Sequence, residues 1–349
     1  MRKSLLPVTL GSLHLSSPVI AGSAEHLVEA EGIRRALDAG AAVVVVKSVN
    51  ESDAARDQLQ RAEYLALDDQ WRPVPWGPDA PRDAFIACRS GLSPQRFDAW
   101  LEQTARLDRE AKARDAYVAA SLILSGLDRL IDMARMVEQA GIRILEVNIG
   151  TPYASQASKG AVSTELDPAR VGAIVRAVRG AVSLPLWVKI TGQSERVPDL
   201  AAAAREAGAD AVVMAGRLLG LIPDLETLEP MLGTSLGVGG HWNLPLTCHW
   251  LALSRRHLGP EFPLIGVNGA QSGHDIARML LAGAHAVEMA TPVMMRGAGV
   301  ITAALQELEA YLARKDLDVH GLIGRAADSR KAFADMPLRM DNWKNYITR

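Results

Sequence analysis

One pattern of apolar and polar residues recurs four times along the chain. An amphipathic stretch ends in Ala-Gly and an almost continuous apolar run follows, as in DAGAAVVVV at 38–46, QAGIRILEV at 139–147, EAGADAVVM at 206–214 and LAGAHAVEM at 281–289. Glycine is favoured just after a helix because it adopts the left-handed conformation without a Cβ penalty. A continuous apolar run is typical of a strand buried on both faces of a parallel sheet. The pattern therefore predicts repeated helix–strand units.

Eight such strands can be placed along the chain. They cover residues 18–23, 41–48, 117–122, 144–149, 186–191, 211–216, 264–269 and 286–291, and amphipathic helical stretches separate most of them. Eight strands that alternate with helices predict an α/β fold of the (β/α)8 TIM-barrel type. An open doubly wound sheet is the alternative. It has less support because no strand leads into a G-x-G-x-x-G or G-x-x-x-x-G-K-[ST] fingerprint.

Three segments fall outside this alternation. The first residues, LLPVTLGSLHLSS, predict a small hairpin that closes one end of the barrel. Residues 52–95 include the proline-rich stretch WRPVPWGPDAP and predict a long excursion over the barrel mouth, where loops often form lids or substrate walls. We expect one domain over 1–349, with a barrel core at about 15–315 and a helical tail at about 316–349 that packs on the barrel or on a partner.

Composition excludes several classes of protein. The 349 residues have a net charge of -2 and are 48% hydrophobic, which is typical of a globular protein and lacks the basic excess of a nucleic-acid binder. Cys88 and Cys248 are the only cysteines and form no Cys-x-x-Cys pair, which argues against an iron–sulfur cluster, a structural zinc site or a disulfide framework. The amino-terminal apolar run is too short for a signal peptide or a membrane span, so we expect a cytoplasmic protein.

Two lysines stand at the ends of predicted strands, where TIM barrels carry their working groups. Lys47 follows four valines, and Lys189 follows Leu-Trp-Val. A buried lysine needs an anion or a hydrogen-bonding ligand, because burying a lone charge is costly. A structural ion pair would satisfy either lysine. Two of them at one barrel mouth favour an electron-rich ligand.

Two glycine clusters precede late helices, GVGGHWNLP at 237–245 and GVNGAQSG at 266–273. Each cluster alone is also typical of a plain turn. Small residues let backbone amides approach a phosphate at a helix N-terminus, and in barrels the phosphate site usually comes from the last loops. Together with Thr291, the two clusters indicate a phosphate-bearing cofactor.

The ordered set AGS, VVVKSV, EVNIGTP, WVKI, GVGG and LIGVNGAQSGHDIARMLLAGAHAVEMAT resembles the dihydroorotate dehydrogenase-like flavoproteins. This family includes the dihydroorotate dehydrogenases and the pyrimidine-reducing domain of dihydropyrimidine dehydrogenase. The resemblance covers roughly residues 5–315. It implies a TIM barrel with FMN lying across the strand ends, in an oxidoreductase of pyrimidine metabolism.

The resemblance also implies a role for each matching residue. Lys47 and Ser48 would contact the flavin ring and the active site, and Asn148 would hydrogen-bond flavin or substrate. Lys189 would stabilise the reduced, anionic flavin at its N1/O2 edge. The remaining cofactor contacts would be Ala21, Gly22 and Ser23 beneath the flavin, and Gly239, Gly240, Asn268, Gly269, Ala290 and Thr291 around the ribityl phosphate.

Thr151 stands where the family has the cysteine or serine that removes a proton from the substrate. With Lys47 and Asn148 it forms the expected catalytic set. A threonine hydroxyl is a weak base unless a neighbour or a water chain accepts the proton, and the alternative is that Thr151 only shapes its loop.

The asparagines that bind orotate in the family are largely replaced here. Arg89, Tyr153, Arg217 and His241 are expected at the substrate side instead. A flat ring with amide edges needs paired amide partners, so a divergent small carbonyl compound competes with dihydroorotate as the substrate.

We therefore expect an FMN-dependent oxidoreductase that acts on CH–CH bonds, with hydride passing between flavin N5 and a carbonyl-activated C–C bond. One alternative is a flavin-free lyase or aldolase that uses Lys189 as a Schiff-base amine. The other is a non-catalytic flavin-binding barrel. We expect a homodimer with a small-molecule substrate and a small-molecule electron acceptor or donor, without a metal, a nucleic-acid partner or a membrane partner.

Overall fold

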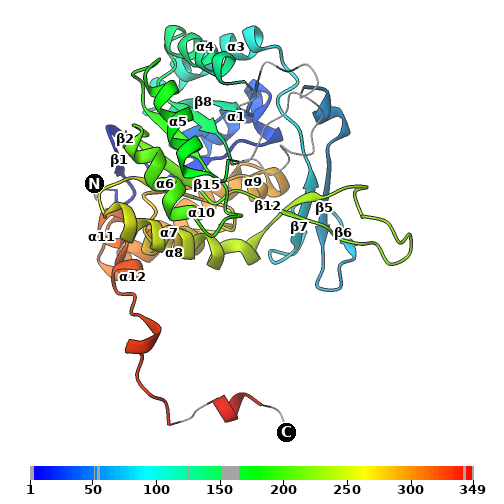
Figure 1. Ribbon diagram of the computed structural model, residues 1–349, viewed down its shortest axis with the longest axis vertical. Helices are drawn as coiled ribbons and strands as arrows, with labels where there is room; N and C mark the ends of the chain where they lie inside the picture. The colour runs from blue at the N-terminus through cyan, green and yellow to red at the C-terminus, as the bar shows by residue number, and fades with distance from the viewer. Residues whose placement is uncertain are drawn as a thin grey trace.

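The computed structural model describes residues 4–50, 52, 56–123, 126–150, 165–340 and 343–347. Its centre is a closed barrel of eight parallel strands surrounded by helices (Figure 1). Around the barrel the strands are β3 (Val19–Ala21), β4 (Val43–Val45), β8 (Tyr117–Ile123), β9 (Leu145–Asn148), β10 (Leu186–Lys189), β11 (Ala211–Met214), β14 (Leu264–Val267) and β15 (Ala286–Met289). Each lies within or beside one of the eight predicted ranges, so the (β/α)8 TIM barrel is confirmed.

The Ala-Gly repeats form the connections that the pattern predicts. Gly40, Gly141, Gly208 and Gly283 all have positive φ angles, between 78° and 112°, just after a helix and before a barrel strand. The principal helices of the outer layer are α1 (Ala30–Asp38), α3 (Phe97–Lys112), α4 (Leu127–Gln139), α5 (Pro168–Arg179), α6 (Val197–Glu206), α7 (Leu244–Leu258), α8 (Gly273–Leu281) and α10 (Gly299–Lys315). Their apolar faces and the strands form one continuous core.

The amino-terminal hairpin is also confirmed. Strands β1 (Val8–Leu10) and β2 (Leu13–Leu15) pair antiparallel, and their buried leucines and Val8 join the main core.

The excursion after β4 is an ordered wall rather than a simple loop. Strands β5 (Glu63–Leu67), β6 (Pro73–Val74) and β7 (Phe85–Arg89) join β12 (Leu218–Gly220) and β13 (Leu236–Gly239) in a five-stranded antiparallel sheet beside the barrel (Figure 1). We call it the wall sheet. It has a small apolar core of its own. The glycine cluster at 237–245 therefore starts within a wall strand, whereas the cluster at 266–273 follows a barrel strand.

The carboxyl-terminal tail only partly follows the expectation. After the short helices α9 (Thr291–Arg296), α11 (Val319–Leu322) and α12 (Arg325–Asp328), the chain leaves the barrel (Figure 1). Asp328 still pairs with Arg255 of α7 at 2.9 Å, and all described residues from 330 onward are exposed and lie away from the barrel. Within the described part of the chain, no helix is long and apolar enough to cross a membrane.

Candidate active site

A pocket opens at the carboxyl ends of the barrel strands and runs beneath the wall sheet. It contains about 1090 Å³ of space between protein atoms, part of it open to solvent. The structure brings together most of the predicted site residues here: Ser23, Lys47, Asn148, Lys189, Arg217, Gly239, Gly240, Asn268, Gly269, Ala290 and Thr291 line the pocket.

Lys189 ends β10 and is buried between two carboxylates. Its Nζ lies 2.6 Å from Oε1 of Glu288 on β15 and 3.1 Å from Oε2 of Glu146 on β9. Burial acts to lower the pKa of Lys189, but the two carboxylates outweigh it and hold that pKa above its usual range. Lys189 is therefore a charged ammonium whose positive charge is largely compensated.

Glu146 is fully buried, unlike most carboxylates. Burial raises the pKa of Glu146, Lys189 lowers it, and the neighbouring Glu288 raises it; the net result is a raised pKa. A lysine with two carboxylates carries one excess negative charge unless one carboxyl holds a proton. The raised pKa favours that proton on Glu146.

Three serines continue this network across the barrel mouth. Ser121 Oγ donates to Glu146 Oε1 at 2.9 Å, Ser48 Oγ lies 2.8 Å from Ser121 Oγ, and Ser23 Oγ lies 3.0 Å from Ser48 Oγ. The backbone N–H of Ser23 donates to Glu288 Oε1 at 3.3 Å. Together with Lys189, these groups close a ring of polar contacts, which we call the polar ring. The predicted Ser48 is thus a member of this ring, although it does not line the pocket.

The chain passes very close to this ring at Gly22. A Cβ placed there would lie 2.5 Å from both Cγ and Oε1 of Glu288, and the Gly22 N–H donates to the carbonyl of Met289 at 2.8 Å. Ala21, the last residue of β3, is completely buried. Glycine at 22 is therefore required by the side chain of Glu288.

Lys47 also has a carboxylate partner. Its Nζ lies 2.8 Å from Glu25 Oε1 and 3.3 Å from Ser90 Oγ, and Ser90 donates to the same Glu25 oxygen at 2.7 Å. Burial acts to raise the pKa of Glu25, but Lys47 outweighs it and lowers that pKa to about 2. Glu25 is therefore ionised, and Lys47 does not face the pocket as a lone charge.

Arg217, from the segment after β11, reaches the wall side of the pocket. Its Nη1 lies 2.7 Å from Sγ of Cys88, a buried residue of β7. Tyr64, on β5, also lines the pocket. The wall sheet thus supplies a thiol and a phenol to a site whose cations come from barrel loops.

Glycines let the backbone approach the far end of the pocket. A Cβ on Gly239 would lie 2.8 Å from Oδ1 of Asn268, and a Cβ on Gly269 would lie 2.6 Å from the backbone of Leu244. Gly240, Asn268 and Gly269 all have positive φ angles, of 119°, 74° and 113°. Gly240 and Gly269 adopt this conformation without steric penalty because they have no Cβ, and asparagine is one of the few other residues that tolerate it.

Two predicted substrate residues lie elsewhere. Arg89 donates from Nε to the carbonyl of Arg61 at 2.8 Å and from Nη1 to the carbonyl of Leu232 at 2.6 Å, and it pairs with Glu63, so it fastens the wall sheet. His241 lies 3.3 Å from Asp275. Neither residue lines the pocket. Thr151 and Tyr153 lie outside the described residues.

The sequence reasoning missed the acidic partners of both lysines. Glu146 and Glu288 each interrupt an apolar strand, in ILEVN and AVEMA, and a glutamate in such a place signals a buried cation nearby. Glu25 and Cys88 gave no comparable signal, because loops and wall strands bring them to the pocket.

These features fit a phosphate-bearing flavin. The glycines at 239, 240 and 269 leave space for close backbone approach, Thr291 supplies a hydroxyl, and Lys189 supplies an ammonium at the barrel end of the pocket. Among the described residues, no group of three or more His, Cys, Asp or Glu side chains could hold a metal ion.

The comparisons with known proteins agree with this architecture. The family model for dihydroorotate dehydrogenase matches residues 74–312. A dihydroorotate dehydrogenase B (NAD(+)) catalytic subunit from Methanosarcina mazei is 28% identical over 328 residues, which cover 93% of this chain and 96% of the relative. A dihydroorotate dehydrogenase A (fumarate) from Lacticaseibacillus paracasei is 36% identical over 147 residues, which cover 42% of this chain and 49% of the relative. Since the family model spans well over half of the sequence, the chain belongs to the dihydroorotate dehydrogenase family.

Proposed function

We propose that this chain is an FMN-dependent oxidoreductase that transfers hydride between a small substrate and the flavin. The observation that carries the proposal is the pocket at the barrel mouth, which is lined by close-packed glycines, by Thr291 and by Lys189. When bound there, FMN would supply the hydride acceptor or donor for a carbonyl-activated C–C bond. Membership of the dihydroorotate dehydrogenase family supports the same chemistry.

The roles of the chain's own residues follow from their contacts. Lys189 would hold the pyrimidine edge of the flavin with an ammonium already compensated by Glu146 and Glu288. Asn148, whose Oδ1 accepts from the Gly150 N–H at 3.1 Å, would present its amide to flavin or substrate. Thr151 would move the substrate proton, with Lys47 beside the reacting atoms.

The state of Lys189 counts against a lyase or aldolase. A Schiff base needs a neutral amine, and enzymes obtain one by lowering the pKa of the lysine. Here two carboxylates hold the pKa of Lys189 above its usual range. A flavin-binding role for this ammonium is therefore the better explanation.

The wall side of the pocket bears on the substrate. Lys47 and Arg217 bring two positive charges and Glu25 one negative charge, so the three side chains together favour an anionic group on the substrate. Dihydroorotate carries a carboxylate and meets this condition. A divergent unsaturated or saturated carboxylic acid without the pyrimidine ring meets it equally.

Two measurements test the proposal in order. The purified protein should be yellow and should release FMN, not FAD, on denaturation; protein that contains no flavin and fails to bind added FMN would refute the cofactor. Flavin-loaded protein should then be mixed anaerobically with dihydroorotate and with saturated carboxylic acids, and separately photoreduced and mixed with orotate and unsaturated acids. A compound that bleaches the oxidised flavin or reoxidises the reduced flavin identifies the reaction. Bound FMN that responds to none of these compounds would support a non-catalytic barrel.

A further inference from the structure

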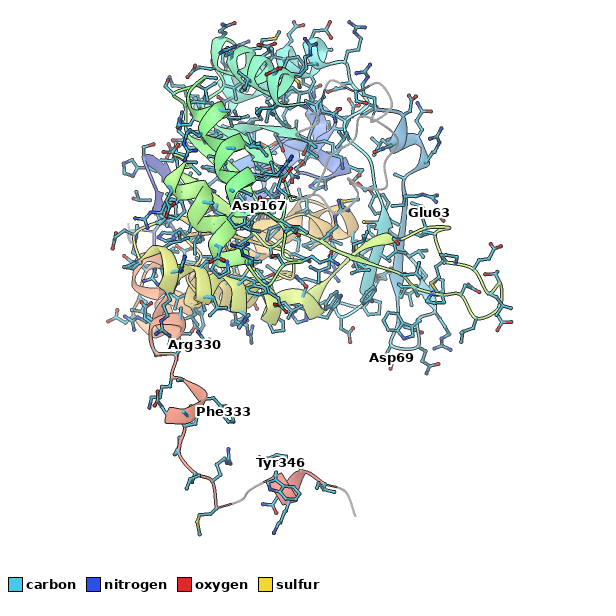
Figure 2. The ribbon with its side chains drawn as sticks, in the orientation of Figure 1. Glu63, Asp69, Asp167, Arg330, Phe333 and Tyr346 are labelled. Atoms are coloured by element: carbon cyan, nitrogen blue, oxygen red, sulfur yellow. The ribbon has the colours of Figure 1, made fainter. Side chains whose placement is uncertain are left out.

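The last part of the chain forms an exposed arm. Residues 330–340 and 343–347 follow α12 and extend away from the barrel (Figure 1), and all of them are exposed. Figure 2 shows Phe333 and Tyr346 on this arm, well clear of the barrel. Phe333 is 95% exposed and Leu338 is 101% exposed, and Met340 and Trp343 are also largely exposed.

The arm has the composition of a binding segment. Its apolar side chains recur every few residues, from Phe333 to Ile347, and would be costly to leave in water. Between them stand the basic residues Arg330, Lys331, Arg339 and Lys344, against only two aspartates. A surface that covers this arm should therefore be apolar at its floor and acidic at its edge.

The same chain carries a surface of this kind on the wall sheet. A groove lies between the turn after β5 and the loop 221–231, and Trp71, Leu221, Ile222 and Leu225 line it. Leu225 and Leu228 are each 84% exposed. We call this surface the wall groove.

Carboxylates surround the wall groove. Asp68 and Asp69 stand on the hairpin side, with Asp69 at the turn in Figure 2, and Asp224, Glu226 and Glu229 stand on the loop side. Arg72 is the one basic residue in residues 68–73 and 221–231, and it is paired with Asp68 at 2.9 Å. The groove edge is thus acidic where the arm is basic.

We propose that the arm of one copy of this chain docks in the wall groove of a second copy, and that the exchange is reciprocal. The two surfaces match in apolar character and are opposite in charge. In Figure 1 the arm extends below the barrel and its end lies clear of the wall sheet, which leaves the groove of its own copy open. A reciprocal exchange closes a two-fold dimer and covers both arms and both grooves. The inference does not depend on the proposed reaction.

Charge reversal with complementation tests the exchange. In full-length protein the arm variant is Lys331→Glu with Arg339→Glu, and the groove variant is Glu226→Lys with Glu229→Lys. Each variant alone places like charges across the contact. Its dimer should therefore have a dissociation constant at least about tenfold higher than that of the parent dimer, as measured by light scattering after gel filtration. Mixed in equal amounts, the two variants should form a heterodimer, because both contacts again join opposite charges.

A matched control separates this result from a general effect of charge. Lys112→Glu with Arg129→Glu reverses two exposed cations on helices α3 and α4 and should leave the dimer unchanged. Circular dichroism and bound flavin report whether each variant is folded. A monomeric parent would overturn the proposal and point to the chain's own groove or another partner. Variants that remain as dimeric as the parent, or folded variants that do not associate on mixing, would overturn it too.

Discussion

Replacing Lys189 by methionine should strongly destabilise the protein, whether or not flavin is bound. The substitution keeps a long apolar stem but removes the ammonium between Glu288 and Glu146, at 2.6 Å and 3.1 Å. At an effective dielectric constant of about 20, the attraction between Lys189 and the ionised Glu288 is about 6 kcal/mol before desolvation is counted. Removal of one partner from a buried ionic group typically costs about 3–5 kcal/mol, because the remaining charge stays buried. We expect a loss in that range.

The pH dependence of the loss identifies its cause. Glu146 has a raised pKa in the folded protein, so its contribution to stability is fully present below the unfolded pKa and is lost as the pH rises through the folded pKa. Without Lys189 this pKa rises further. The deficit of Lys189→Met should therefore be small near about pH 5 and larger near about pH 8.

Urea unfolding followed by circular dichroism measures the deficit, with and without added FMN. Lys112→Met, at an exposed lysine of α3, is the control and should change the unfolding free energy by less than about 0.5 kcal/mol. A second variant, Lys189→Met with Glu288→Gln, should regain part of the lost stability because one buried charge is gone. If Lys189→Met unfolds within about 1 kcal/mol of the parent at both pH values, the polar ring does not hold the charges assigned to it.

Three further outcomes are expected. Gly22→Ala places a Cβ 2.5 Å from Glu288 and should lower the free energy of unfolding in urea by about 1–3 kcal/mol. Gly299→Ala is the control, because its Cβ meets nothing within 4 Å, and should not lower it. Equal unfolding free energies for the two variants would contradict the close approach at Gly22. Glu25→Gln should have a lower free energy of unfolding than the parent at neutral pH, and this difference should shrink as acid protonates Glu25, whose pKa is about 2. If the difference stays constant between about pH 5 and about pH 2, the ion pair with Lys47 is not its source. Thr151→Val should keep FMN but slow substrate-driven flavin reduction by about 10²–10⁴-fold, while Thr151→Ser keeps much of the rate; a valine variant as fast as the parent would leave Lys47 as the next candidate.

The barrel could be predicted because its information is local. Each barrel strand is a short apolar run, four of the eight follow an Ala-Gly turn, and the repetition of helix and strand determines the architecture. The wall sheet could not be predicted in the same way. Its strands β12 and β13 are three and four residues long and contain glycine. β12 pairs with β13, and β13 is stabilised by pairing with a distant segment, β7.

The residues of the candidate site also fall into two groups, those that the sequence could place and those that it could not. Residues at strand ends, such as Lys189 and Asn268, could be assigned because the barrel places every strand end at one mouth. The partners of the lysines could not, since Glu25 reaches Lys47 from a separate loop. Arg89 was predicted to bind substrate, but its guanidinium donates to the backbone carbonyls of Arg61 and Leu232 instead. The sequence alone does not distinguish these two uses of an arginine.

The wall sheet joins two insertions that leave the barrel at distant points of the chain. One follows β4 and the other follows β11, and they are hydrogen-bonded where Gly237 pairs with Cys88 and Gly239 with Ile86. Because β7 and β13 are paired, the two insertions form one rigid unit. Neither insertion can move away from the pocket unless the other moves with it or the hydrogen bonds between β7 and β13 break. This pairing also imposes an order on assembly, because contacts between distant segments form late in folding. The barrel closes by a still more distant pairing, of β15 with β3, so neither the roof nor the base of the pocket is complete until the chain through β15 has been made.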